Sequence, residues 1–223
     1  MARVVAPGVP HHVTQRGNRR LETFFGDADY RAYRALLAEH CAAAGVACWA
    51  YCLMPNHVHL ILVPAEADGL RRALAEAHRR YTRRINFREG WRGHLWQERF
   101  HSFPLDETWL LSAVRYLERN PVRAGLVARP RQWPWSSARA HLTGRDDELA
   151  EVAPLLERVP DWAAYLAENL EDARLEKLRR HARTGRPLGA EAWVRSLEHR
   201  LGRALAPGKP GPLPKRKAKK ARR

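Results

Sequence analysis

The sequence predicts an α+β fold, a ferredoxin-like antiparallel sheet with helices on one face, over roughly the first 135 residues. Two observations lead to this fold class. Short runs rich in β-branched residues alternate with longer segments whose apolar residues recur at helical spacing. In order, these segments form a strand, a helix, two strands, a helix, a strand and a helix. The short turn between the two adjacent strands favours antiparallel pairing.

Local signals mark the ends of these elements. The expected elements are a strand at 9–17, a helix at 27–45, strands at 46–53 and 57–64, a helix at 68–87, a strand near 94–103 and a helix from 107 to about 120. Gly17 stops the first strand, and Asp27 and Gly45 bracket the first helix. Met54–Asn56 forms the turn between the middle strands, and Pro121 perturbs the end of the last helix.

Composition limits the class of partner. The 223 residues include 40 lysines and arginines and 24 acidic residues, a formal net charge of +16, with 45% hydrophobic residues. This balance argues against a typical small-metabolite enzyme and favours nucleic acid over an anionic membrane surface. The longest apolar run, around Leu60–Pro64, is far below the ~18 residues of a membrane span. Met1–Pro10 lacks the apolar part of a signal peptide, and three cysteines suggest no disulfide framework, so we expect a reduced, cytoplasmic protein.

The C-terminal third is expected to be organised separately. We predict a main domain at 1–142, a helical appendage at 143–205 with helices near 161–181 and 190–203, and a disordered basic tail at 206–223. The tail combines prolines with like charges, which oppose packing, and it fits either a solubility tail or a nucleic-acid arm. The appendage helices fit either a small DNA-binding unit or a helical pair packed on the main domain.

Two histidines stand at the start of the most hydrophobic strand. His57 and His59 flank Val58, and alternate residues of a strand point to the same face, so the two imidazoles lie side by side. Such a pair can chelate one divalent metal, although two ordinary sheet histidines explain the pattern equally well. Because ligating imidazoles must be neutral, a metal site here should lose activity as the pH falls through about 6.5.

The helix that follows Asp106 adds two polar groups. Tyr116 lies beside the apolar stripe of this helix, and Asn120 lies one turn further on the same face. If this face packs against the histidine strand, a phenol, an amide and two imidazoles converge. A phenol beside a metal-bound phosphate is a potential nucleophile. The pattern alone still favours an ordinary half-buried tyrosine at the edge of the core.

Several segments, in the same order, resemble a known family. They are HHVTQRGN at 11–18, YCLMPNHVH at 51–59, LWQERF at 95–100, YLERNPVRAG at 116–125 and WPWSS at 133–137. The histidine strand is similar to the His-hydrophobe-His motif of the HUH endonucleases. Together the segments resemble the single-tyrosine, IS200-like transposases, and within them the branch associated with repetitive extragenic palindromes (REPs). The resemblance covers roughly residues 8–142.

This resemblance implies a transposase that cuts and rejoins single-stranded DNA near hairpins. It implies that Tyr116 attacks a phosphodiester to form a 5′-phosphotyrosine. It further implies that His57, His59 and Asn120 hold Mg²⁺ or Mn²⁺. The broader group commonly has glutamine in place of Asn120, whose side chain is shorter.

Basic side chains are expected to complete the site. The candidates for DNA contact are Arg16, Arg19 and Arg20 after the first strand, and Arg72, Arg79, Arg80 and Arg83 on the second helix. A charged run is usually a solvated face, but few acids interleave on this helix. Trp91, Trp96 and Phe100 fit either core packing or stacking on bases, and His12 is expected to be only a sheet residue.

Three functions remain compatible with the sequence. The first is a metal-dependent strand transferase, and the second is a non-catalytic protein that keeps the fold and binds hairpin DNA. The third is a replication initiator or relaxase with the same chemistry. All four expected site residues are present, which favours the first. We expect single-stranded or hairpin DNA as the partner, without a membrane or a small-molecule cofactor, and the sequence does not distinguish a monomer from a dimer.

Overall fold

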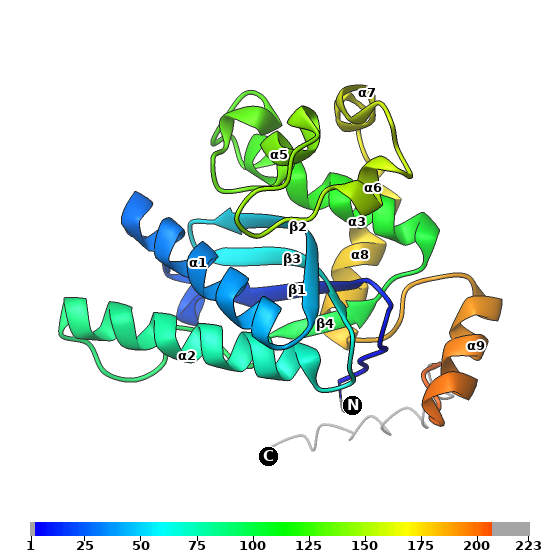
Figure 1. The fold of residues 1–223 in the computed structure, drawn as a ribbon, viewed down its shortest axis with the longest axis horizontal. Coiled ribbons are helices and arrows are strands. Elements are labelled where there is room, and N and C mark those ends of the chain that lie inside the picture. Colours follow the sequence, from blue (N-terminus) through cyan, green and yellow to red (C-terminus); the bar gives the residue numbers. More distant parts are fainter. Residues whose placement is uncertain (1–2, 207–223) are drawn as a thin grey trace, which may run out of the picture.

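Four antiparallel strands form the centre of the molecule (Figure 1). The computed structural model describes residues 3–206, so nearly all of the tail expected at 206–223 lies outside the described residues. The strands are β1 (His11–Arg16), β2 (Val46–Met54), β3 (His57–Pro64) and β4 (His101–Pro104), in the spatial order β2-β3-β1-β4. The predicted α+β fold class with an antiparallel sheet is confirmed, but helices pack on both faces of the sheet and not only on one. The last strand is shorter than the one expected at 94–103.

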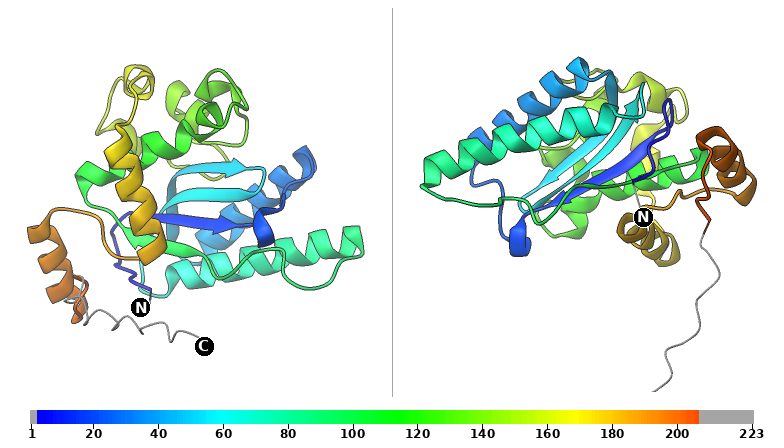
Figure 2. Two further views of the ribbon diagram at one scale, coloured as in Figure 1. Left: turned by 180° about the vertical axis from the view of Figure 1, so that it is seen from behind. Right: turned by 90° about the horizontal axis from the view of Figure 1, so that it is seen from below.

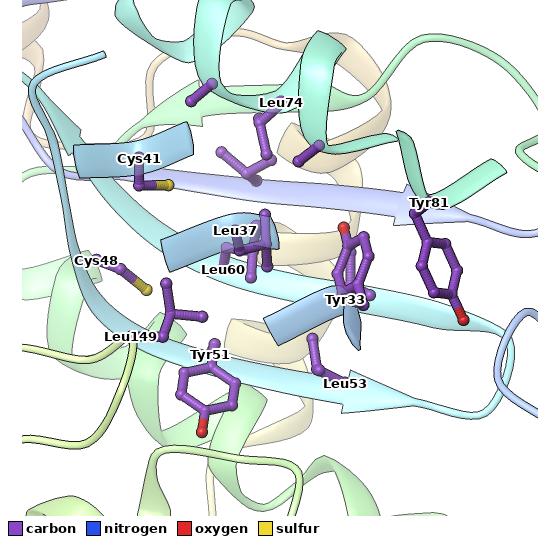
Figure 3. Packing of buried hydrophobic residues seen from close by; sticks show 14 of the residues in the cluster. Tyr33, Leu37, Cys41, Cys48, Tyr51, Leu53, Leu60, Leu74, Tyr81 and Leu149 are labelled. Carbon is purple, nitrogen blue, oxygen red and sulfur yellow. The ribbon is translucent and has the colours of Figure 1, made fainter. Parts of the chain in front are cut away.

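Helices α1 (Asp27–Ala43) and α2 (Gly69–Glu89) cover one face of the sheet (Figure 1). Val58, Leu60 and Leu62 alternate along β3 toward this face and join its buried core. Figure 3 shows Leu60 packed among side chains of α1, α2 and β2. Since alternate strand residues point to opposite faces, this packing directs His57 and His59 to the other face of the sheet.

The opposite face is covered by α3 (Glu107–Glu118) and α8 (Asp172–Thr184), as Figure 2 shows from behind. Asp106 caps α3, because its carboxylate accepts a hydrogen bond of 2.9 Å from the backbone N–H of Trp109. Leu110, Val114 and Leu117 of α3 pack against this face of the sheet in a second core. The Tyr116 side of α3 therefore faces the histidine side of β3.

The remaining described helices are short, and they lie at the edges of this arrangement (Figure 1). They are α4 (Asn120–Arg123), α5 (Ala138–Thr143), α6 (Ala153–Leu156), α7 (Trp162–Ala167) and α9 (Glu191–Leu201), with 3-10 turns at Asn18–Arg20 and Pro130–Gln132. α9 packs on the N-terminal segment, where Leu197 joins Val4 and Val9 in a third cluster.

The helix expected at 161–181 is two helices, α7 and α8. The break follows α7, where Glu168 has extended backbone angles. Arg119 donates hydrogen bonds to the carbonyl oxygens of Leu166 and Ala167 and to the side chain of Asn169. These carbonyl groups at the end of α7 are thus satisfied by a distant arginine rather than by the next helical turn, an effect that local periodicity cannot predict.

A buried acid connects the C-terminal helices to α3. Glu118 is 0% exposed and accepts hydrogen bonds from Ser137 (2.7 Å), from the Nδ1 of His141 (2.7 Å) and from the indole N–H of Trp162 (2.9 Å). Trp162 also stacks on His141 and belongs to the same hydrophobic core as α3. The division of the chain at residue 142 stays a prediction, although residues on both sides of it share this core.

Candidate active site

The two histidines of β3 lie next to each other. The ring centroids of His57 and His59 are 5.0 Å apart, with the rings nearly perpendicular. The Nδ1 of His57 donates to the side-chain oxygen of Asn56 (2.6 Å), which leaves its Nε2 with a lone pair. The Nδ1 of His59 shares a 3.0 Å hydrogen bond with the Nε2 of His12 on the neighbouring strand β1.

Burial keeps these imidazoles neutral. It lowers the pKa of His57 to about 3, helped by the positive charges of Arg16 and Arg123. It lowers the pKa of His59 well below the usual 6.5, and the neighbouring His57 and His12 lower it further. Neutral imidazole is the form that coordinates a metal. These lowered pKa values move the expected loss of activity of a metal site here to a pH well below 6.5.

Tyr116 reaches the same place from α3. Its ring centroid lies 5.4 Å from that of His59, its residue is only 9% exposed, and the guanidinium carbon of Arg123 lies 4.4 Å from the ring centroid. The ring also meets His12 edge-on at 6.2 Å. The predicted convergence of a phenol with two imidazoles is present in the structure.

Asn120 completes the group, just beyond the end of α3. Its amide nitrogen lies 3.4 Å from the Nε2 of His57, and its amide oxygen accepts a hydrogen bond of 2.7 Å from Arg123. The oxygen, the ligand that a hard cation prefers, is thus engaged by an arginine, while the nitrogen faces the imidazole. Coordination through this oxygen requires the amide to turn over and to release Arg123.

A pocket of about 530 Å³ opens over these side chains. Its walls include His57, His59 and Tyr116, together with Arg16 and Arg20 from the end of β1. Further wall residues come from the segment before β4 and from α8. A polar pocket with buried titratable groups and several arginines fits an anionic substrate.

The donor set suits a divalent cation held by two histidines. Both imidazoles are neutral, and the hydrogen bond from His57 to Asn56 directs the Nε2 of His57 away from the strand. Within residues 3–206, three or more histidine, cysteine or acidic side chains nowhere gather in a way that could hold a metal. A cation here would therefore have few protein ligands, which leaves coordination positions for water or phosphate oxygens.

Sequence reasoning missed the role of His12, which was expected to be only a sheet residue. It stacks on His59 at 5.2 Å, and burial lowers its pKa to about 3. Its Nδ1 has no hydrogen-bond partner among the described residues. The signal was the double histidine at the start of the first strand. However, the pairing of β1 with β3 is what brings this ring to His59.

The sequence also matches the model of a known family. Residues 8–120, about half of the chain, match the model of the family described as Transposase IS200 like. The chain belongs to the IS200-like transposase family. The match begins before β1 and ends at Asn120, so it contains all four residues of the candidate site.

The chain is also similar to one curated protein and to two solved structures. A provisionally named REP-associated tyrosine transposase of Haemophilus influenzae is 27% identical over 124 residues, which cover 51% of this chain and 64% of the relative. A solved REP-associated tyrosine transposase bound to a REP hairpin has a similar fold, with a TM-score of 0.53 and 21% identity over 66% of this chain and 88% of that one. A provisionally assigned transposase from Deinococcus radiodurans R1 gives a TM-score of 0.39 at 19% identity, over 53% and 95% of the two chains.

The arginines that are predicted to contact DNA lie in two places. Arg16 and Arg20 line the pocket, and Arg19 and Arg20 both have positive φ angles in the turn after β1. Such angles are costly for non-glycine residues, and strained turns of this kind cluster at functional sites. Gly17 allows the turn, because a Cβ there would lie 2.2 Å from the carbonyl oxygen of Leu21.

The arginines of α2 lie on the other side of the sheet from Tyr116. They are exposed, and acids pair with several of them: Arg72 with Glu66 before the helix, Arg79 with Glu76 of the same helix, and Arg80 with Glu39 of α1. Arg83 is exposed as well. Contact of this face with DNA stays a prediction. A search of residues 3–206 finds no helix long and apolar enough to span a membrane.

Proposed function

We propose that this IS200-like transposase cleaves and rejoins single-stranded DNA with Tyr116 as the nucleophile. The observation that carries the proposal is the meeting of the Tyr116 ring with His57 and His59 in one pocket, 5.4 Å from the nearer imidazole. A phenol, two neutral imidazoles and nearby arginines together supply a nucleophile, metal ligands and phosphate-binding groups.

The reaction is an exchange of phosphate esters. The oxygen of Tyr116 attacks the phosphorus, a bond forms between them, and the bond to the 3′ oxygen of the DNA breaks. The phenol gives up its proton and the leaving 3′ oxygen takes one up, so charge and atoms balance. The product is a 5′-phosphotyrosine with a free 3′-hydroxyl. A 3′-hydroxyl can attack this ester in turn, so rejoining needs no external energy source.

His57, His59 and Asn120 would hold the cation, Mg²⁺ or Mn²⁺. When bound, the cation polarises the scissile phosphate and offsets the charge that develops on its oxygens. The hydrogen bonds of His57 to Asn56 and of His59 to His12 orient the two rings for this task. Arg16 and Arg20, at the pocket wall, bind and orient the phosphodiester.

Hairpin-bearing single-stranded DNA is the proposed substrate. The support is the family of this chain, its net charge of +16, and the similar fold of a transposase that was solved with a REP hairpin. A second candidate, a non-catalytic protein that binds hairpin DNA, gains support from the way Arg123 engages the amide oxygen of Asn120. The two candidates differ in covalent chemistry.

The nucleophile is tested with Tyr116→Phe, which removes only the hydroxyl group. We expect the parent to form a covalent DNA adduct in Mn²⁺ or Mg²⁺, detected on denaturing gels and mapped by mass spectrometry. Tyr116→Phe should lose the adduct but bind the same hairpin. Tyr30→Phe, on the opposite face of the sheet, is the matched control and should react like the parent. A parent that binds the hairpin without forming an adduct in either metal favours the second candidate.

The metal ligands are tested with His57→Ala and His59→Ala. Each should reduce cleavage at least 100-fold, because one imidazole alone is a poor chelate, and each should still bind the hairpin. Asn120→Ala should be milder, because water can replace one oxygen ligand of a hard cation. EDTA should stop cleavage, and added Mn²⁺ should restore it. Undiminished cleavage by His57→Ala would show that the metal lies elsewhere.

A further inference from the structure

Part of the candidate active site comes from outside the region that matches the family model. The match ends at residue 120, whereas α8 begins at Asp172. Nevertheless Arg179 and Arg183 of α8 line the pocket that contains Tyr116, and so do Leu178 and Ala182, the residues that precede them. Figure 2 shows α8, in gold, lying across the back of the sheet.

The position of α8 is determined by specific contacts. Leu178 is 1% exposed and belongs to the core that α3 forms with the sheet. Arg174 donates a hydrogen bond to the hydroxyl of Ser112 on α3, and its guanidinium lies over the ring of Trp109. Arg179, one residue beyond Leu178, is therefore held at the pocket and is not simply part of a mobile surface.

The charges at the pocket also point to an anion. Arg16 comes from the end of β1, Arg20 from the turn after it, and Arg179 and Arg183 from α8, so arginines from separate parts of the chain surround the pocket. Glu98 is the one acid that lines it in the described residues, and it contacts His101 at 2.9 Å. Four guanidinium groups at one pocket repel one another unless an anion lies between them.

Arg179 and Tyr116 line the same pocket. The hydrogen bond of Arg179 with Glu176 on its own helix raises the pKa of Arg179, so it remains charged at every pH at which the protein is folded. The pair with Glu176 is largely exposed and therefore weak, since the two side chains are 46% and 64% accessible. A phosphate can replace this partner at little cost, because guanidinium binds phosphate in a two-pronged geometry.

We infer that Arg179 and Arg183 of α8 form a phosphate-binding site that holds the DNA backbone at Tyr116, opposite Arg16 and Arg20. This inference rests on the proposed function only in taking DNA as the source of the phosphate. It gives the C-terminal region a direct part in substrate binding. A strand in the pocket would be held between β1 on one side and α8 on the other.

The experiment measures binding without relying on cleavage. In a Tyr116→Phe background, Arg179→Ala and Arg183→Ala are compared with Arg180→Ala, which removes the same charge from an exposed position of α8 that does not line the pocket. The probe is a short unpaired oligonucleotide, titrated by fluorescence anisotropy at several salt concentrations. We expect Arg179→Ala and Arg183→Ala to weaken binding five- to tenfold, and Arg180→Ala to change it less than twofold.

Salt dependence and a second variant sharpen the test. Each lost phosphate contact should reduce the slope of log affinity against log salt by about 0.7. Glu176→Gln, which removes the competing carboxylate, should tighten binding. Equal effects of Arg179→Ala and Arg180→Ala, with equal slopes, would overturn the inference. A parent that binds the oligonucleotide through Arg179 but forms no adduct would contradict the proposed function alone.

Discussion

At the scale of single residues, His12 determines which ring nitrogen of His59 is available to a metal. If the Nε2 of His59 is to bind a metal, its Nδ1 must carry the proton and donate it to the Nε2 of His12. Neutral His12 then carries its own proton on Nδ1, which lacks a partner in the described part of the chain. The tautomers of His59 and His12 are thus coupled, so His12 should matter although it need not touch the metal.

We predict that His12→Phe lowers the affinity for Mn²⁺ by about 10- to 100-fold, the usual cost of losing a partner that orients a metal-binding histidine. The measurement is Mn²⁺ binding by electron paramagnetic resonance in the absence of DNA. His94→Phe is the control, because His94 lines a different pocket and contacts neither His57 nor His59. Parental affinity in His12→Phe would show that His59 needs no such partner.

The lowered pKa values predict an unusual pH dependence. The pKa of His57 is about 3, so in the folded protein protons compete with metal only when the pH falls toward that value. Mn²⁺ affinity should thus stay nearly constant between pH 7.5 and 5.5, as long as the protein remains folded. A tenfold loss of affinity centred at pH 6.5 would instead indicate solvated, ordinary imidazoles.

At the scale of elements, two sides of α3 have different roles. Tyr116 faces the pocket, and Glu118, two residues later, faces α5 and α7 through His141 and Trp162. The helix that carries Tyr116 is therefore held in place by the segment that follows it in sequence. Through Glu118, α5 and α7 therefore help to hold Tyr116 in position.

We predict that Glu118→Ala lowers the free energy of unfolding by about 3–5 kcal/mol, because it leaves buried polar groups of Ser137, His141 and Trp162 without their acceptor. Urea denaturation provides the measurement. Glu107→Ala, on the same helix, breaks only the exposed pair with Arg158 and should cost less than about 1 kcal/mol. Similar losses in the two variants would mean that the buried network contributes little.

At the scale of the whole molecule, the folded protein buries several neutral histidines. Burial lowers the pKa of His11 to about 4 and those of His12, His57 and His78 to about 3, and it lowers that of His59 as well. In the unfolded chain these groups bind protons near pH 6.5. As the pH falls below 6.5, the unfolded state takes up protons that the folded state does not, so stability is lost.

We therefore predict that the metal-free protein is markedly less stable at pH 5 than at pH 8. Each histidine that stays neutral in the folded state at pH 5 costs about 2 kcal/mol of stability there. Urea denaturation midpoints, measured in EDTA at pH 5 and at pH 8, test this prediction. His78→Gln should reduce the difference, whereas His94→Gln, for which burial is small, should not. Equal denaturation midpoints at pH 5 and pH 8 would mean that the buried imidazoles have ordinary pKa values in the folded protein.

The sequence by itself determined the fold class and the local geometry of the site. Strand alternation is enough to put His57 and His59 on one face, and helical spacing is enough to put Asn120 one turn after Tyr116. Both relations involve residues a few positions apart, where backbone geometry leaves little choice. The resemblance to the family motifs then led to the hypothesis that these four residues form one site.

Only the tertiary structure decided which distant groups meet these residues. The antiparallel register of β1 with β3 places His12 beside His59. Glu39 and Glu66 pair with arginines of α2, although few acids stand among these arginines in the sequence. The burial of Leu178 brings Arg179 to the pocket from a region outside the family match. These contacts join residues far apart in the chain and depend on how whole elements pack, which local periodicity does not encode.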